Sequence, residues 1–125
     1  MTYKNILHID DDYDDLEIFR AVIETIDSKI ECISVNSAVE ALKKLTSGEL
    51  CPEVIFIDLN MPVMDGFEFL TEIKKVSDFN IPVVVLSTSS QRETISKVNK
   101  LGADGYVAKP NSIKEFVRLL SPYLI

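Results

Sequence analysis

The chain has 125 residues, of which 46% are hydrophobic, and this is enough for one compact domain with its own core. Its 20 acidic and 13 basic side chains give a net charge of −7, which argues against direct binding to DNA or RNA. No stretch approaches the roughly 18 apolar residues of a membrane span, and the N-terminus lacks a secretory pattern. We therefore expect one cytoplasmic domain over residues 1–125, with no output domain and no membrane partner.

The two cysteines do not predict a special site. Cys32 falls in an apolar run and Cys51 in a predicted loop. They form no CxxC motif and have no histidine nearby, so the sequence suggests neither a disulfide framework nor a zinc site.

The first predicted strand covers residues 5–9 and is followed by a run of aspartates: Asp10, Asp11, Asp12, Asp14 and Asp15. After this run, hydrophobic residues recur at helical spacing, which predicts a helix lying on a sheet. These residues are Leu16, Phe19, Ile23 and Ile26. Helix capping and compensation of the helix dipole account for the last three aspartates. They do not account for the first two, which lie too early, at the tip of the strand.

A second strand is predicted over residues 30–35. Ser37 and Glu40 have the spacing of a capping box, which opens a helix through about Leu45. Gly48 then ends this strand and helix unit.

Residues 54–66 are the stretch around which the rest is organised, and they begin with an apolar run over residues 54–57. Four consecutive apolar residues predict a central strand that is buried on both faces. Asp58 follows at once, and a Met-Pro pair and an Asp-Gly pair then turn the chain into the next helix. The sequence therefore presents Asp58 on a short, stiff loop at the carboxyl edge of the sheet.

The third predicted helix runs from Gly66 to about Val76. A loop over residues 77–82 leads from it to a fully apolar strand, residues 83–86, which ends at Ser87. The side chains that we expect this helix to bury are Phe67, Leu70 and Ile73.

Two further capping-box patterns, Ser90 with Glu93 and Ser112 with Glu115, open the last two predicted helices. Between them lies a short strand, residues 106–108, which stops at a Lys-Pro pair. The side chains predicted to face inward are Ile95, Val98 and Leu101 on the first of these helices and Ile113, Phe116, Val117 and Leu120 on the second.

Five strand-then-helix units of about 25 residues predict an α/β fold, because parallel strands need crossover connections. Right-handed crossovers give a doubly wound, five-stranded parallel sheet, for which we expect the strand order 2-1-3-4-5. This is a flavodoxin-like (βα)5 sandwich. In this order the first and third strands are neighbours, so Asp10, Asp11 and Asp58 should converge at one edge.

Three converging carboxylates repel one another unless a cation lies among them. Because the ligands are all oxygen atoms, the cluster favours Mg²⁺, with Mn²⁺ as a possibility, over zinc. Ser87 and Lys109 lie at the same edge of the predicted sheet. A metal, a hydroxyl and an ammonium around one exposed carboxylate suit phosphoryl transfer, with Asp58 as the nucleophile that becomes an acyl phosphate.

The sequence resembles the response-regulator receiver domains of two-component signalling, in particular their stand-alone members. The motifs that carry the resemblance are Ile-Asp-Asp-Asp at 9–12, Ile-Asp-Leu-Asn-Met-Pro-Val-Met-Asp-Gly at 57–66, Val-Leu-Ser-Thr at 85–88 and Val-Ala-Lys-Pro at 107–110. The resemblance implies that Asp58 accepts a phosphoryl group from a histidine kinase or a phosphotransfer protein. It also implies that Asp10, Asp11, Asp58 and the backbone carbonyl of Asn60 bind Mg²⁺.

The resemblance further implies a two-state switch. Ser87 and Lys109 would move toward the phosphoryl group, and Tyr106 would turn with Ser87. The helix after residue 90, the last strand and the last helix would then present a new surface to a protein target. The chain would be a monomer or a phosphorylation-dependent dimer, and its Lys109-Pro110 bond is a candidate for the cis form.

Two residues depart from the family pattern. Thr88 stands where the family generally has Ala or Gly, and its bulk is expected to slow entry of a phosphodonor, a phosphatase or water. Tyr13 stands where related stand-alone members often have Pro, which would change the entrance to the metal site. Neither departure removes a required group.

Other interpretations stay open. A haloacid-dehalogenase-type phosphatase also uses Asp and Mg²⁺, but the segment Asp10 to Asp14 lacks the final Thr or Val of its D-x-D-x-[T/V] pattern. An FMN carrier is disfavoured because the aspartates would repel the cofactor phosphate. The complete motif set argues against a degenerate receiver that acts only as a scaffold.

His8 is interpreted as a core residue with satisfied hydrogen bonds rather than as a phosphorelay histidine.

Overall fold

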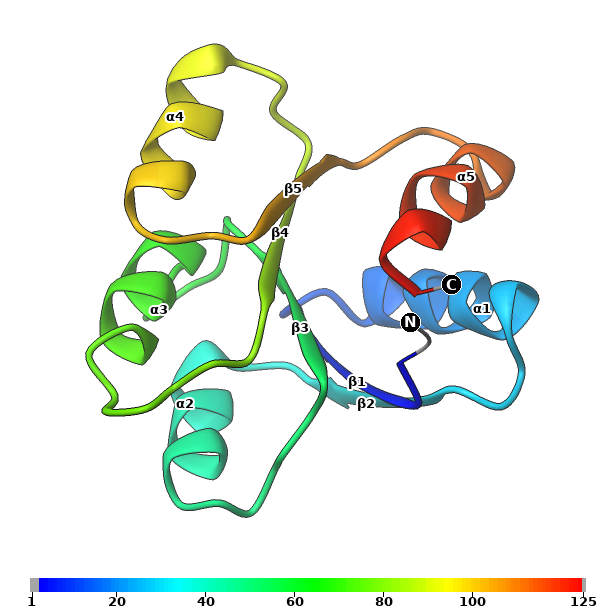
Figure 1. The fold of residues 1–125 in the computed structure, drawn as a ribbon. Helices are drawn as coiled ribbons and strands as arrows, with labels where there is room; N and C mark the ends of the chain where they lie inside the picture. Colours follow the sequence, from blue (N-terminus) through cyan, green and yellow to red (C-terminus); the bar gives the residue numbers. More distant parts are fainter. Residues whose placement is uncertain (1–2, 125) are drawn as a thin grey trace.

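The computed structural model describes residues 3–124, which form one five-stranded parallel sheet with helices on both faces (Figure 1). The strand order is β2-β1-β3-β4-β5. The strands are β1 (Asn5–Ile9), β2 (Glu31–Val35), β3 (Val54–Asp58), β4 (Val83–Ser87) and β5 (Gly105–Ala108). The helices are α1 (Tyr13–Ile26), α2 (Ala38–Thr46), α3 (Gly66–Ile73), α4 (Arg92–Lys100) and α5 (Ile113–Leu124). The predicted fold class and strand order are confirmed.

Figure 1 shows α1 and α5 on one face of the sheet and α2, α3 and α4 on the other. Each strand residue faces one layer or the other, because side chains alternate along a strand. In β3, Ile55 and Ile57 pack into the cluster beneath α2, α3 and α4, whereas Val54 and Phe56 pack beneath α1 and α5. All residues of β3 and β4 are buried, as the continuous apolar runs predict.

The register of β1 against β3 determines which side chains meet at the edge. Ile6 pairs with Val54, and His8 pairs with Phe56. Two residues further along the two strands are Asp10 and Asp58, so both aspartates emerge at the same edge of the sheet.

The third helix is shorter than predicted, since α3 ends at Ile73 and not near Val76. The reason is a tightening of the chain: the amides of Lys75 and Val76 donate to carbonyls only three residues back. The predicted burial also needs a correction, because Phe69 is fully buried and Phe67 is only half-buried.

The capping predictions were partly correct. Ser37 and Ser112 each accept a hydrogen bond from the amide three residues ahead, but Ser90 does not, and Gln91 precedes α4 without a side-chain cap. A reciprocal capping box joins Asp65 and Glu68 instead.

Two predicted core residues lie elsewhere. Ile113 is about half exposed, at 53%. Ile95 is half-buried and lines a shallow surface pocket on α4 together with Arg92 and Lys100.

None of the helices in residues 3–124 has the length and hydrophobicity that a membrane crossing requires.

The two free thiols differ in their surroundings, which predicts different reactivity. Cys51 is exposed, whereas Cys32 is half-buried on β2 and burial raises its pKa to about 11. Because only the thiolate is nucleophilic, we expect iodoacetamide at pH 8 to modify Cys51 at least about tenfold faster than Cys32. A time course of intact mass, with Cys51→Ser as control, measures this. Equal rates at the two thiols would contradict the buried position of Cys32.

Candidate functional site

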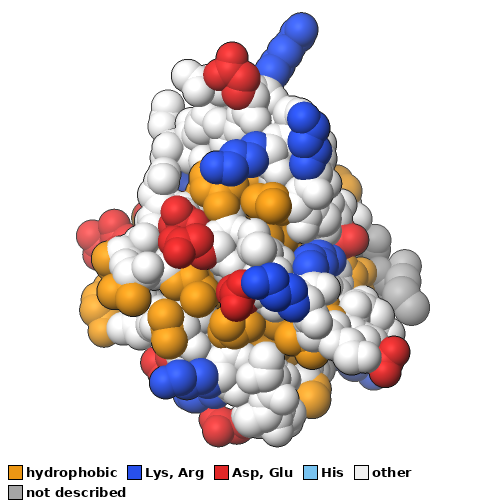
Figure 2. Space-filling view, turned by 90° about the vertical axis from the view of Figure 1, so that its left-hand side faces the viewer, with side chains coloured by type: hydrophobic (Ala, Val, Ile, Leu, Met, Phe, Trp, Pro, Cys, Tyr) orange, Lys and Arg blue, Asp and Glu red, His pale blue; other side chains and the backbone are white. Residues whose placement is uncertain are grey.

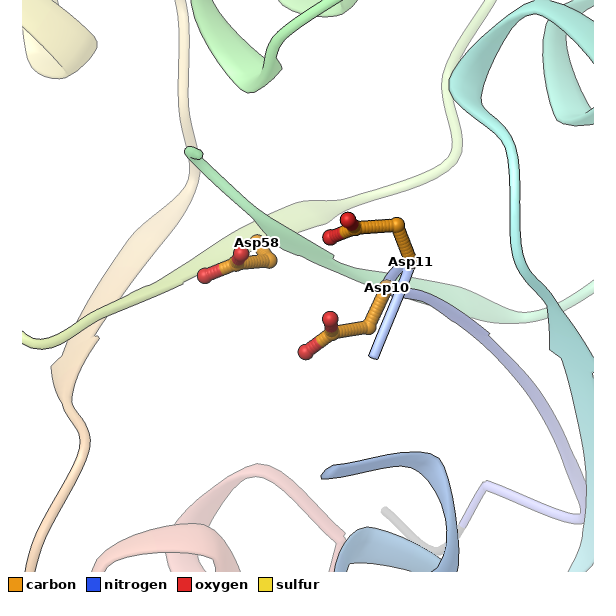
Figure 3. Close-up of side chains that lie close together, drawn as sticks. All are labelled: Asp10, Asp11 and Asp58. Carbon is orange, nitrogen blue, oxygen red and sulfur yellow. The ribbon is translucent and has the colours of Figure 1, made fainter. Parts of the chain in front are cut away.

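Three carboxylates meet at the carboxyl edge of the sheet, as the sequence predicts. One oxygen atom from each of Asp10, Asp11 and Asp58 lies within 4.8 Å of the others. Figure 3 shows that Asp10 and Asp11 come from the end of β1 and Asp58 from the end of β3, and that all three extend to the same side. Asp10 and Asp58 are buried, whereas Asp11 is exposed.

The loop after β1 holds Asp10 in place. Its Oδ1 atom accepts a hydrogen bond of 3.0 Å from the amide of Asp12, whose own side chain caps the N-terminus of α1. Burial raises the pKa of Asp10 to about 6, although the Asp12 amide and Lys109 both act in the opposite direction. Burial likewise raises the pKa of Asp58, against the influence of Lys109. Burial therefore disfavours the negative charge of both carboxylates, and a cation bound between them would stabilise that charge.

Lys109 lies at the centre of the acidic site. Its Nζ atom is 3.0 Å from Oδ1 of Asp58, 3.1 Å from Oδ2 of Asp10 and 3.2 Å from Oδ2 of Asp15. Burial alone would lower the pKa of Lys109, but the charges of Asp58 and Asp10 outweigh it and raise this pKa above its ordinary value. The side chain thus stays charged and balances part of the acidic cluster.

Asp15 is a site residue that the sequence analysis missed, because its place in the first turn of α1 was explained by the helix dipole. The helix packs beside α5, and this packing brings its first turn to the end of β5, where Lys109 lies.

Ser87 and Tyr106 lie close to this edge. Ser87 is the last residue of β4 and is buried, and its hydroxyl accepts a hydrogen bond from the amide of Ser89. The hydroxyl of Tyr106, on β5, donates to the backbone carbonyl of Ser89. Ser89 therefore connects the two residues that the sequence analysis paired.

The Lys109-Pro110 bond is trans, so the candidate cis form is not seen.

The remaining predicted residues lie around the entrance. Asn60 is exposed in the loop after β3, and Thr88 is exposed in the loop after β4. Tyr13 begins α1, is 68% exposed, and its hydroxyl accepts a hydrogen bond of 2.9 Å from Asn36. This contact directs the Tyr13 ring toward the loop after β2. The roles assigned to Asn60, Thr88 and Tyr13 stay predictions.

Gly66 supports the site in a way that the sequence did not reveal. Its amide donates to the carbonyl of Leu59, and a Cβ atom there would lie 2.8 Å from the backbone oxygen of Asp58 and 2.8 Å from Cα of Leu59. The first turn of α3 can therefore approach the end of β3, which carries Asp58, only because residue 66 has no side chain.

His8 is in the interior, as predicted, but it is not satisfied. Its ring stacks on Phe19 at a centroid distance of 3.9 Å, and within residues 3–124 neither ring nitrogen has a hydrogen-bond partner. Burial, helped by the charge of Lys109, lowers its pKa to about 3, so the ring is neutral. A buried imidazole beside the acidic site was not explained by the sequence.

The donor set fits a hard divalent cation. The three clustered aspartates offer only oxygen atoms, two of them from buried carboxylates, and no cysteine or histidine belongs to the cluster. Magnesium and manganese prefer such ligands, whereas zinc prefers nitrogen and sulfur.

Comparisons with known proteins agree with this geometry. The family model described as the response regulator receiver domain matches residues 6–121. The polar-differentiation response regulator DivK of Brucella suis is 26% identical over 97% of this chain and 96% of its own length. The chain also matches the sensor histidine kinase CheAY of Helicobacter pylori, at 29% identity over 86% of this chain, but it spans only 13% of that longer protein.

Two solved structures are informative. The phosphorylated cyanobacterial phytochrome response regulator RcpA has a TM-score of 0.86 and 27% identity, covering 98% of this chain and 91% of its own. The Mn²⁺-bound form of response regulator Rcp1 has a TM-score of 0.82 and 30% identity, covering 95% of this chain and 90% of its own.

Proposed function

Because the chain belongs to the response-regulator receiver family, we propose that Asp58 is its phosphoacceptor. The phosphoryl group would come from a phosphohistidine of a histidine kinase or a phosphotransfer protein. The observation that carries this proposal is the convergence at one edge of Asp58, two further aspartates and the ammonium of Lys109.

The chemistry assigns a task to each group. An oxygen atom of Asp58 attacks phosphorus, the bond from phosphorus to the donor imidazole breaks, and the leaving imidazole takes a proton from solvent. Lys109, now bound to Asp58, would hold a phosphoryl oxygen, and the Ser87 hydroxyl would bind another. The receiver would supply this machinery itself for both gain and loss of the phosphoryl group.

Magnesium, or manganese, would be held by Asp10, Asp11, Asp58 and the backbone carbonyl of Asn60. When bound, the ion supplies charge neutralisation for the phosphoryl oxygens. The all-oxygen donor set supports this assignment, and so does the Mn²⁺-bound Rcp1 structure.

The output surface is proposed to be α4, β5 and α5. The hydrogen bond from Tyr106 to Ser89 joins β5 to the loop before α4. Because the amide of Ser89 also donates to the Ser87 hydroxyl, a movement of Ser87 would shift this loop and Tyr106. In Figure 2, basic side chains gather over the upper part of the face formed by α2, α3 and α4, where α4 lies. Arg92, Lys97 and Lys100 of α4 provide this charge in an acidic chain, which favours a protein target with acidic residues.

The alternatives from the sequence are not favoured, because the receiver-domain match covers residues 6–121 and DivK, which aligns over 96% of its own length, is a response regulator. A cytoplasmic location, one receiver domain over residues 1–125, and a monomer or phosphorylation-dependent dimer stay predictions.

The proposal is tested by intact-mass measurement after incubation with acetyl phosphate and Mg²⁺. We expect one added phosphoryl group on the wild type, none after EDTA treatment and none on Asp58→Asn. The matched control is Asp78→Asn, in an exposed loop after α3, which should be labelled like the wild type.

An unlabelled wild type, or a label that persists in Asp58→Asn, would overturn the assignment of Asp58. Multiple turnover of a phosphoester that is lost on Asp10→Asn and kept in Asp58→Asn would support a phosphatase instead.

A further inference from the structure

If His8 only filled space in the core, its two unpaired ring nitrogens would lower the stability of the fold. It lies on β1 with 1% exposure, between Ile6 and Asp10 on the same face of the strand, and across from Phe56 on β3. A neutral imidazole carries one N–H donor and one acceptor, and burying either without a partner costs free energy. A phenyl ring would stack on Phe19 without this cost.

The unpaired ring is directed at the acidic site. Nε2 of His8 lies 4.0 Å from Oδ2 of Asp10, which is too far for a direct hydrogen bond. A cavity of about 20 Å³ is bounded by His8, Asp10, Asp15, Lys109 and hydrophobic side chains. This volume suits a single water molecule, and the polar groups around it supply the partners that a buried water needs.

We propose that His8 is a positioning residue for Asp10, and that its Nε2–H reaches Oδ2 of Asp10 through one water molecule in this cavity. Oδ1 of Asp10 is already fixed by the amide of Asp12, and Oδ2 is also 3.1 Å from Nζ of Lys109. With His8 as the additional donor, both oxygen atoms of Asp10 are oriented from the side of the protein. Asp10 would thus be held in the cluster in which one oxygen atom from each of Asp10, Asp11 and Asp58 lies within 4.8 Å of the others.

This inference rests on the proposed function, because it concerns the role of Asp10 as a ligand for a divalent cation. Groups that orient a metal ligand typically change the affinity for the metal by about tenfold or more when they are removed. The phosphoryl chemistry itself does not require His8, so its removal should affect metal affinity and not the limiting rate.

The experiment uses His8→Phe, which keeps a ring on Phe19 and removes both nitrogen atoms. Isothermal titration of the EDTA-treated chain with Mn²⁺ should show about tenfold weaker binding than for the wild type. Urea unfolding of the metal-free chain should show no loss of stability. In acetyl phosphate labelling, the half-saturating Mn²⁺ concentration should rise by a similar factor, while the rate at saturating Mn²⁺ is unchanged.

Two further variants separate orientation from packing. His8→Gln restores a side-chain N–H and should recover most of the Mn²⁺ affinity. Phe19→Leu removes the stacked ring while leaving His8 intact, so it should lower stability without weakening Mn²⁺ binding. If His8→Phe does not fold, His8→Leu replaces it in the same titration.

Mn²⁺ binding by His8→Phe that equals that of the wild type would overturn the role of His8 and leave the proposed function intact. Weak binding that His8→Gln does not recover would also overturn it, since packing would then be the cause. A wild type that binds no Mn²⁺ would overturn the metal site of the proposed function, and the inference with it.

Discussion

Replacing Lys109 with methionine should lower the free energy of unfolding by about 3 kcal/mol at neutral pH without divalent cations, because it leaves buried carboxylates without their cation. Nζ of Lys109 is within 3.2 Å of carboxylate oxygens of Asp10, Asp15 and Asp58, and its side chain is only 14% exposed. Methionine has a similar length and is apolar, so the loss would come from charge and not from a cavity. Urea denaturation in EDTA measures the difference.

The matched control is Lys44→Met on α2. Lys44 lies 3.1 Å from Glu40, but this pair is on the surface, where water and salt screen it, so Lys44→Met should unfold almost like the wild type. Addition of Mn²⁺ should recover part of the stability of Lys109→Met and leave that of Lys44→Met unchanged, since only the first lies beside the carboxylate cluster. Equal losses in the two variants would show that Lys109 is not needed to balance the buried charge.

The main features of the site could be predicted from the sequence because they depend on strand ends. Apolar runs placed β1 and β3 correctly, and the parallel order made them neighbours. Asp10 and Asp58 each follow such a run directly or end it, so the register of the strands brings them together. Lys109 could be placed in the same way, as the first residue after β5.

What the sequence did not reveal depends on packing between elements that lie far apart in the chain. Asp15 reaches Lys109 only because α1 packs beside α5, and this contact has no signal in local spacing. Ile95 and Ile113 match the helical period, yet Ile95 is only half-buried and Ile113 is exposed, because local spacing does not tell how far the neighbouring elements cover each helix. The absence of space at Gly66 is likewise visible only in three dimensions.

Gly66→Ala should therefore destabilise the fold, by about 3 kcal/mol, although alanine is the better helix former. The new Cβ would lie 2.8 Å from the carbonyl oxygen of Asp58 and 2.8 Å from Cα of Leu59, and backbone atoms that follow a buried strand do not give way cheaply. Relief of this clash has to move α3 or the end of β3, which carries Asp58. We thus expect weaker Mn²⁺ binding together with the loss of stability, as measured by titration and urea denaturation.

Gly48→Ala provides the comparison that separates space from backbone conformation. Gly48 has a φ of +81°, and an added Cβ there would have no atom within 4 Å, so alanine would cost about 1 kcal/mol for the left-handed backbone alone. Because Gly48 follows α2 and makes no contact with the carboxylate cluster, Mn²⁺ affinity should not change. If Gly66→Ala were as stable as the wild type and bound Mn²⁺ equally well, the end of β3 with Asp58 would have to be movable, and the rigid position of that carboxylate would be wrong.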